Sequence, residues 1–242
     1  MSLSFERVSY SYHTPAGETE AIRDLTFAVE DGQFVSLIGP SGCGKSTILS
    51  LAAGLITPSG GKVARGDGHF GYMLQTDALF PWRTVEQSIF LPLEVKHRNT
   101  REMRENALAL AEKYGLKEFL KKTPPQLSGG MRQRVALIRT LAAQPDTLLL
   151  DEPFSALDYQ TRLAVCDDVH AIIKSEHKTA LLVTHDISEA ISLSDKVISL
   201  SARPATVVGE HCIDFGDGSP KSRRASGKFA ATFETLRGEL GI

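Results

Sequence analysis

The 242-residue sequence predicts an α/β fold: a core with a mainly parallel sheet, an N-terminal antiparallel β subdomain and an inserted α-helical subdomain. Three apolar runs, at 34–38, 147–152 and 179–185, are continuous enough for strands buried on both faces. Segments with helical spacing of apolar residues separate them, and strands that alternate with helices favour a parallel sheet. The segment 80–127 is helical in pattern and forms the predicted insertion.

Composition limits the possible functions. The chain is 42% hydrophobic and 23% charged, and its formal net charge of −2 gives no general attraction to nucleic acid or anionic lipid, so we expect no nucleic-acid partner. Cys43, Cys166 and Cys212 are scattered and odd in number, which favours a reducing, intracellular compartment over a disulfide framework. No apolar run approaches the ~20 residues that cross a bilayer, so a membrane role would need a partner.

The elements follow in order along the chain. Short alternating apolar runs on either side of the polar loop 13–20 predict a small antiparallel sheet in the first 30 residues. The strand 34–38 leads into a glycine loop, and the helix from Lys45 to Ala53 ends at Gly54. Thr84 and Gln87 have capping-box spacing at the start of the helical insertion.

A helix is expected after the break TPPQ at 123–126, because Met131, Val135, Ile138 and Ala142 recur at helical intervals. In the tail, 216–228 is interpreted as a solvated basic linker, with contact to lipid headgroups the less favoured alternative, and 229–240 as a helix. The whole chain, 1–242, is expected to be one domain. Its expected parts are a core of 1–79 and 128–215, a helical subdomain of 80–127, and a C-terminal loop and helix of 216–242.

The glycine loop at 39–47, GPSGCGKST, matches the pattern GxxxxGK[ST] between a predicted strand and a predicted helix. Its glycines let backbone N–H groups surround a phosphate, and the helix N-terminus favours negative charge. Lys45 would reach the β and γ phosphate oxygens, and the Ser46 hydroxyl would bind Mg²⁺. A merely tight turn would explain the glycines but not Lys45 and Ser46 in register.

Carboxylates at a second strand end complete a nucleotide site. Asp151 follows the apolar run of LLLDE and is the candidate to hold Mg²⁺ directly or through water. Glu152 is placed to act as general base on the attacking water. His185 ends a third strand and would sense the γ-phosphate, while Gln75 could contact both Mg²⁺ and the water. Alone, the Asp-Glu pair would more often be a solvated strand end and the histidine a structural hydrogen-bonding residue, and a glutamine in a loop would carry no information.

A second glycine-containing helix start, LSGG at 127–130, follows a proline break and not a strand, so it is not a second phosphate loop of the same sheet. Ser128 as N-cap, with Gly129 and Gly130, nevertheless offers exposed N–H groups for an anion. We expect two copies to face each other, so that the LSGG of one closes on the ATP held by the other, in an ATP-driven dimer cycle.

Together these motifs resemble the ATP-binding subunit of ATP-binding-cassette (ABC) transporters. By this resemblance 39–47 is the Walker A loop, Gln75 the Q-loop, LSGGMRQR at 127–134 the signature, LLLDE the Walker B strand, 155–158 the D-loop and His185 the switch histidine. Tyr12 is similar in position to the aromatic that stacks on adenine, with Tyr10 as its rival. The residues expected to contact nucleotide are Tyr12, Gly39, Ser41, Gly42, Cys43, Gly44, Lys45, Ser46, Thr47, Ser128, Gly129 and Gly130.

A finer resemblance, to importer subunits of the nitrate/sulfonate/taurine group, rests on QTDALFPWRTVEQSI at 75–89 and LSARPATVV at 200–208. It implies a second ATPase subunit, a transmembrane permease and, indirectly, a solute-binding protein, with the chain peripheral at the cytoplasmic face of the membrane. Some relatives carry thiamine precursors, and 60–71 is shorter than the usual hairpin, so the resemblance does not fix the solute. The apolar segment 77–82 would meet the permease or pack between subdomains.

Other classes remain open at the level of sequence. A soluble ABC ATPase of DNA repair or translation would share the sites, but such proteins usually carry long coiled-coil insertions or paired cassettes, for which this chain has no room. A non-hydrolysing regulatory module would not need Glu152 and His185. A kinase with the same phosphate loop would leave LSGG and His185 without a role.

Overall fold

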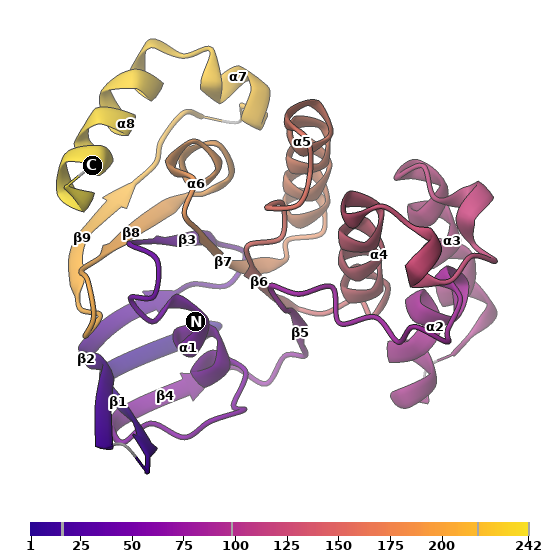
Figure 1. The fold of residues 1–242 in the computed structure, drawn as a ribbon. Helices are drawn as coiled ribbons and strands as arrows, with labels where there is room; N and C mark the ends of the chain where they lie inside the picture. The colour runs from indigo at the N-terminus through magenta and orange to yellow at the C-terminus, as the bar shows by residue number, and fades with distance from the viewer. Residues whose placement is uncertain (16, 98, 217, 242) are drawn as a thin grey trace.

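The computed structural model describes residues 1–15, 17–97, 99–216 and 218–241, and Figure 1 shows two sheets with a group of helices to one side. The smaller sheet is antiparallel, in the order β2-β1-β4. Its strands are β1 (Leu3–Thr14), β2 (Gly17–Val29) and β4 (Gly60–Arg65). The antiparallel N-terminal sheet is therefore confirmed, although β1 and β2 extend into the segment expected to be a polar loop.

The larger sheet has the strand order β5-β6-β7-β3-β8-β9, and all neighbours are parallel except β8 and β9. Its strands are β3 (Phe34–Ile38), β5 (Phe70–Met73), β6 (Thr147–Asp151), β7 (Thr179–Thr184), β8 (Lys196–Leu200) and β9 (Val207–Cys212). Every residue of β3, β6 and β7 is buried, which explains their unbroken apolar runs. The mainly parallel sheet is confirmed.

Helix α1 (Lys45–Ala52) joins the two sheets. Its side chains Ile48 and Leu49 belong to one core cluster with Phe5 of the small sheet and Leu37 of the large one. The glycine loop that precedes α1 is consequently fixed at both ends, by a fully buried strand before it and a buried helix after it.

The remaining helices cover the other side of the large sheet and extend away from it (Figure 1). They are α2 (Val85–Val95), α3 (Arg101–Lys113), α4 (Gly129–Ala142), α5 (Tyr159–Ser175), α6 (Ile187–Leu193), α7 (Pro220–Arg224) and α8 (Gly227–Leu240), with 3-10 turns at Lys117–Phe119 and Pro124–Gln126. The capping box is confirmed: Gln87 N donates to Thr84 Oγ1 at 3.2 Å, and Thr84 N donates to Gln87 Oε1 at 2.9 Å. Among the described residues, no helix combines the length and apolar character needed to cross a bilayer.

The C-terminal segment differs from expectation. Within 216–228, of which Asp217 lies outside the described residues, helix α7 replaces the expected solvated linker. Arg223 is only 4% exposed, and its Nη1 donates to the carbonyl oxygens of Ser194 at 2.8 Å and Ser192 at 3.4 Å. The solvated interpretation was wrong because this guanidinium binds the C-terminal carbonyls of α6, a favourable place for a cation. The expected helix at 229–240 is confirmed by α8.

Candidate functional site

A cavity of about 260 Å³ lies beside the glycine loop. Its lining residues come from the loop and α1, from the segment after β5, and from the ends of β6 and β7. They are Ser41, Gly42, Gly44, Lys45, Ser46, Thr47, Gln75, Glu152 and Val183. Apart from Val183, each was predicted from the sequence, so the fold gathers residues more than 100 positions apart around one space.

The loop conformation requires glycine at two of its positions. Gly42 has φ +74° and Gly44 has φ +124°, values that side-chain-bearing residues rarely adopt. Gly44 is also the N-cap of α1, and no side chain in the described part of the chain caps that helix start. The backbone N–H groups at the start of α1 are therefore available to bind an anion, and phosphate binding needs such donors.

Lys45 is buried, and its Nζ donates to the carbonyl oxygens of Gly39 at 2.8 Å and Pro40 at 2.9 Å. These two bonds fold the ammonium back over the loop, where phosphate oxygens could exchange for the carbonyls. Cys43 is 1% exposed and packs in the core, and the lining residues of the cavity within the described ranges include neither Cys43 nor Gly39. Their predicted contact with nucleotide therefore stays a prediction.

Asp151 ends β6 with a buried carboxylate, and within the described residues its Oδ1 has no hydrogen-bond partner. Burial raises the pKa of this carboxyl, while a hydrogen bond from Ser46 and the charge of Lys45 act in the opposite direction. An unpartnered buried oxygen beside a serine hydroxyl fits a divalent cation, because Mg²⁺ is commonly held by one or two protein oxygens together with phosphates.

Glu152 and His185 lie in contact, with His185 Nδ1 3.1 Å from Glu152 Oε1. Glu152 has φ +46°, an uncommon value for a side-chain-bearing residue, so its main chain must be held in place. Its N–H donates to Val183 O at 2.9 Å, and its carbonyl accepts from Gln133 Nε2 and Ser155 Oγ, each at 3.1 Å. These hydrogen bonds hold the Glu152 backbone so that its side chain lines the cavity.

Gln133 was not identified from the sequence as a site residue. It lies on α4, one turn after the LSGG start, and is 6% exposed. Its bond to the Glu152 carbonyl connects the signature helix to the end of β6. Helical spacing places Gln133 among residues facing the core, and a polar residue on that face was the available signal.

Gln75 lines the cavity, whereas Tyr12 lies at its margin: the Tyr12 hydroxyl is 2.8 Å from Thr47 Oγ1, and the side chain is 43% exposed. Tyr10 meets Tyr12 edge to face with ring centroids 5.0 Å apart, and Tyr10 packs against the core. The exposed ring of Tyr12 is therefore the better placed of the two to stack on a base.

The signature residues lie apart from this cavity. Ser128 caps α4, its Oγ accepting from Met131 N at 3.3 Å, and Ser128 and Gly129 are exposed. The cavity beside the glycine loop, as described by the ordered ranges given above, is not lined by Ser128, Gly129 or Gly130. Within one chain, the two helix starts do not share a space.

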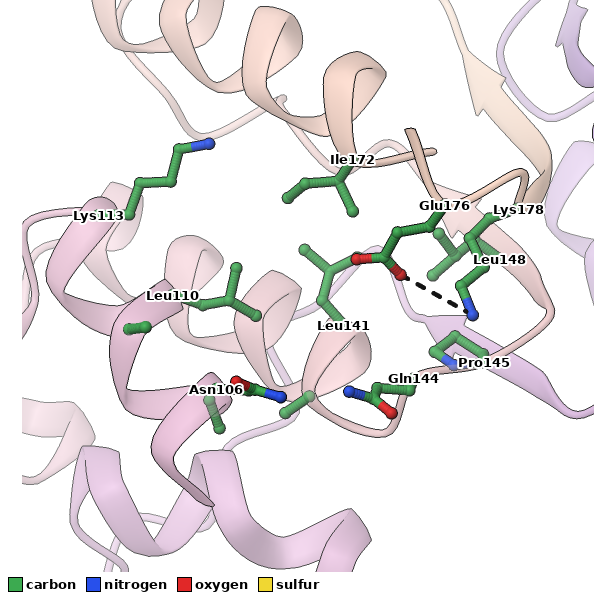
Figure 2. A pocket seen from close by; sticks show the side chains of 13 residues that line it. Asn106, Leu110, Lys113, Leu141, Gln144, Pro145, Leu148, Ile172, Glu176 and Lys178 are labelled. Carbon is green, nitrogen blue, oxygen red and sulfur yellow. Dashed lines mark ion pairs between the residues drawn. The ribbon is translucent and has the colours of Figure 1, made fainter. Parts of the chain in front are cut away.

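A larger cavity, of about 370 Å³, lies between α3 and α5 (Figure 2). Its wall is largely apolar, with Leu110, Leu141 and Ile172, and Glu176 and Lys178 form an ion pair of 3.9 Å at its edge. It contains none of the predicted site residues, and its lining offers no phosphate-binding loop. A cavity's size therefore does not identify the candidate nucleotide site, which is the smaller of these two cavities.

Comparison with known proteins agrees with this geometry. Residues 22–155 match the family model described as ABC transporter. The chain is 44% identical to the uncharacterized ABC transporter ATP-binding protein YtlC of Bacillus subtilis (strain 168), over 98% of this chain and 95% of that protein. It is 45% identical to the aliphatic sulfonates import ATP-binding protein SsuB 1 of Rhodococcus jostii (strain RHA1), over 78% of this chain and 76% of that protein.

Solved structures agree as well. A dimeric bacterial ABC transporter cassette has a TM-score of 0.80 at 30% identity, covering 88% of this chain and 100% of its own. A dimeric post-hydrolysis state of an ATP-binding cassette bound to ADP and Pi has a TM-score of 0.78 at 29% identity, with the same coverage. This chain belongs to the ABC transporter family, as an ATP-binding subunit that hydrolyses ATP.

Proposed function

We propose that the chain works as a pair of identical ATPase subunits that drive a transmembrane permease for import of a small solute of the sulfonate, nitrate or taurine class. A thiamine-precursor type of solute is the second candidate. The subunits would lie peripherally at the cytoplasmic face of the membrane, held there by the permease, and a solute-binding protein would act on the other side. The name of the sulfonate-import relative, which is 45% identical, favours a sulfonate.

The observation that carries the paired arrangement is the separation of two anion-binding helix starts in one chain. The start of α1 opens into the phosphate cavity, while the exposed start of α4 with Ser128 and Gly129 does not. A second copy placed head to tail would bring its α4 start to the γ-phosphate. Both halves of such a shared site exist in one sequence, which favours two identical copies.

In the proposed reaction, Lys45 and the loop N–H groups hold the β and γ phosphates of ATP. Glu152 accepts a proton from the attacking water. His185 holds the Glu152 carboxylate through Nδ1 and would contact the γ-phosphate through Nε2. Ser46, Gln75 and Asp151 would hold Mg²⁺, which neutralises charge on the phosphates when bound.

The permease would dock beside the segment 77–82. Phe80 is 43% exposed and Trp82 72% exposed, and their rings stack with centroids 5.1 Å apart. Asp77 is tied to α4 through Arg132 Nε at 2.8 Å. An exposed aromatic pair on an anchored segment is suited to meeting an apolar partner surface.

Affinity purification of the chain from detergent-solubilised membranes tests this proposal, with mass spectrometry of what accompanies it. We expect a polytopic permease. A doubly substituted control, Phe80→Ser with Trp82→Ser, should keep ATPase activity and lose the permease. Recovery of only soluble or nucleic-acid-bound partners would contradict the import function.

A further inference from the structure

We propose that Arg162 is a positioning residue of the ATPase site, which ties the turn 155–158 to the start of α6 and so sets His185 against Glu152. The inference rests on the roles proposed above for those two residues. It adds a residue that none of the sequence motifs contains.

Arg162 lies in the first turn of α5 and reaches two other segments. Its Nη2 donates to Leu157 O at 3.2 Å, and its Nη1 lies 3.5 Å from Asp186 Oδ2 and 3.6 Å from Glu189 Oε1. The side chain is 27% exposed, so these contacts are largely sheltered from water. A guanidinium can hold a carbonyl and a carboxylate simultaneously, which the single ammonium of lysine does less well.

The partners of Arg162 fix the backbone on both sides of His185. Asp186 Oδ1 accepts from the N–H groups of Ser188 at 2.8 Å and Glu189 at 3.1 Å, which caps α6. On the other side, Thr184 Oγ1 accepts from Asp186 N at 3.0 Å and lies 2.7 Å from Glu189 Oε2. These hydrogen bonds therefore hold the residues immediately before and after His185.

The His185 side chain itself is 60% exposed, so little packing holds its ring. Its orientation depends on its backbone and on the 3.1 Å contact with Glu152. Arg162, Glu152 and His185 also border one small cavity of about 30 Å³. A shift of Asp186 after loss of the guanidinium would be transmitted directly to the preceding residue, His185.

A purely structural role offers a competing account. Glu189 is 5% exposed, and Arg162 could serve only to neutralise this buried carboxylate. That account predicts a less stable protein whose remaining folded fraction hydrolyses ATP normally. The positioning account predicts a change in turnover per folded molecule.

The first test compares steady-state ATP hydrolysis of Arg162→Gln and Arg162→Lys with the parent chain, normalised to folded protein by thermal melting. We expect kcat to fall about 10-fold or more in Arg162→Gln, less in Arg162→Lys, and KM for ATP to stay within about 2-fold, because the glycine loop is untouched. Since Arg162→Lys keeps a charge beside Glu189, it remains informative if Arg162→Gln folds poorly.

The matched control is Lys174→Gln, which removes another cation of α5 from its ion pair with Asp195 at 2.6 Å. The two ion pairs have similar exposure, but Lys174 does not border the small cavity in the part of the chain that the structure describes. We expect Lys174→Gln to change stability and not kcat. Equal losses of kcat in both variants, or a raised KM with normal kcat, would overturn the positioning role.

A double-mutant cycle with His185→Ala then tests whether Arg162 acts through His185. If Arg162 acts through His185, Arg162→Gln should lower kcat by less than about 2-fold further in the His185→Ala background. A full independent loss would overturn the inference for Arg162 alone. An unchanged kcat in His185→Ala itself would contradict the proposed role of His185, and the inference would fall with it.

Discussion

The two helix starts of this chain that contain glycine have different surroundings. At α1, the N-cap is Gly44, and the loop wraps a cavity that also contains Gln75 and Glu152. At α4, the N-cap is Ser128, whose side chain bonds to Met131 N, and the start is exposed. One helix start is completed within the chain and the other faces outward, which is the asymmetry that a site shared between two copies requires.

One substitution at each helix start should separate the two roles most strongly. Lys45→Ala should weaken ATP binding about 10- to 100-fold, because a charge-assisted contact to phosphate is lost. Ser128→Arg should leave ATP binding to the isolated chain unchanged and abolish hydrolysis, because it obstructs only the partner's site. Nucleotide titration and phosphate release measure the two effects.

Equal loss of ATP binding in both variants would show that the two helix starts act on one nucleotide within one chain. A matched control is Ser219→Arg, which changes the N-cap serine of α7 in the C-terminal segment. It should alter neither binding nor hydrolysis.

A smaller effect is expected at the margin of the α1 cavity. Tyr12→Ala should weaken ATP binding about 10-fold, since stacking of a base on an aromatic ring contributes ~1–3 kcal/mol. Tyr10→Ala serves as the control, because Tyr10 packs against the core. Measured ATP affinities in the reverse order would transfer the stacking role to Tyr10.

The smallest effect concerns the cap of α4. Ser128→Ala removes the acceptor for Met131 N and should lower the free energy of unfolding by about 1 kcal/mol. Denaturant unfolding of the chain without nucleotide measures this change. Because α1 has no comparable side-chain cap within the described residues, Ser41→Ala should leave the free energy of unfolding nearly unchanged.

Local pattern predicted much of this molecule. The buried runs of β3, β6 and β7 and the motif at 39–47 place Lys45, Asp151 and Glu152 at one edge of a parallel sheet. Such apolar runs are easily recognised in a sequence because strands covered on both faces have no polar side. The order of strands then brings these ends together without any further signal in the sequence.

Contacts between distant polar side chains could not be predicted. Gln133 on α4 binds the Glu152 carbonyl across 19 positions, and Arg162 meets Asp186 across 24 positions. Arg223 and its exposed neighbour Lys221 are both basic residues, yet Arg223 is buried against α6. Whether a charged side chain faces solvent or binds another part of the protein depends on how the helices pack. The spacing of apolar residues along one segment does not contain this information.

Sedimentation velocity of Glu152→Gln with saturating ATP tests the shared site most directly. Loss of the proposed general base should slow hydrolysis by about 10²- to 10⁴-fold and preserve bound ATP, so we predict an ATP-dependent dimer. Adding Ser128→Arg in the same chain should return it to monomer. A variant that binds ATP with normal affinity and stays monomeric would contradict the account.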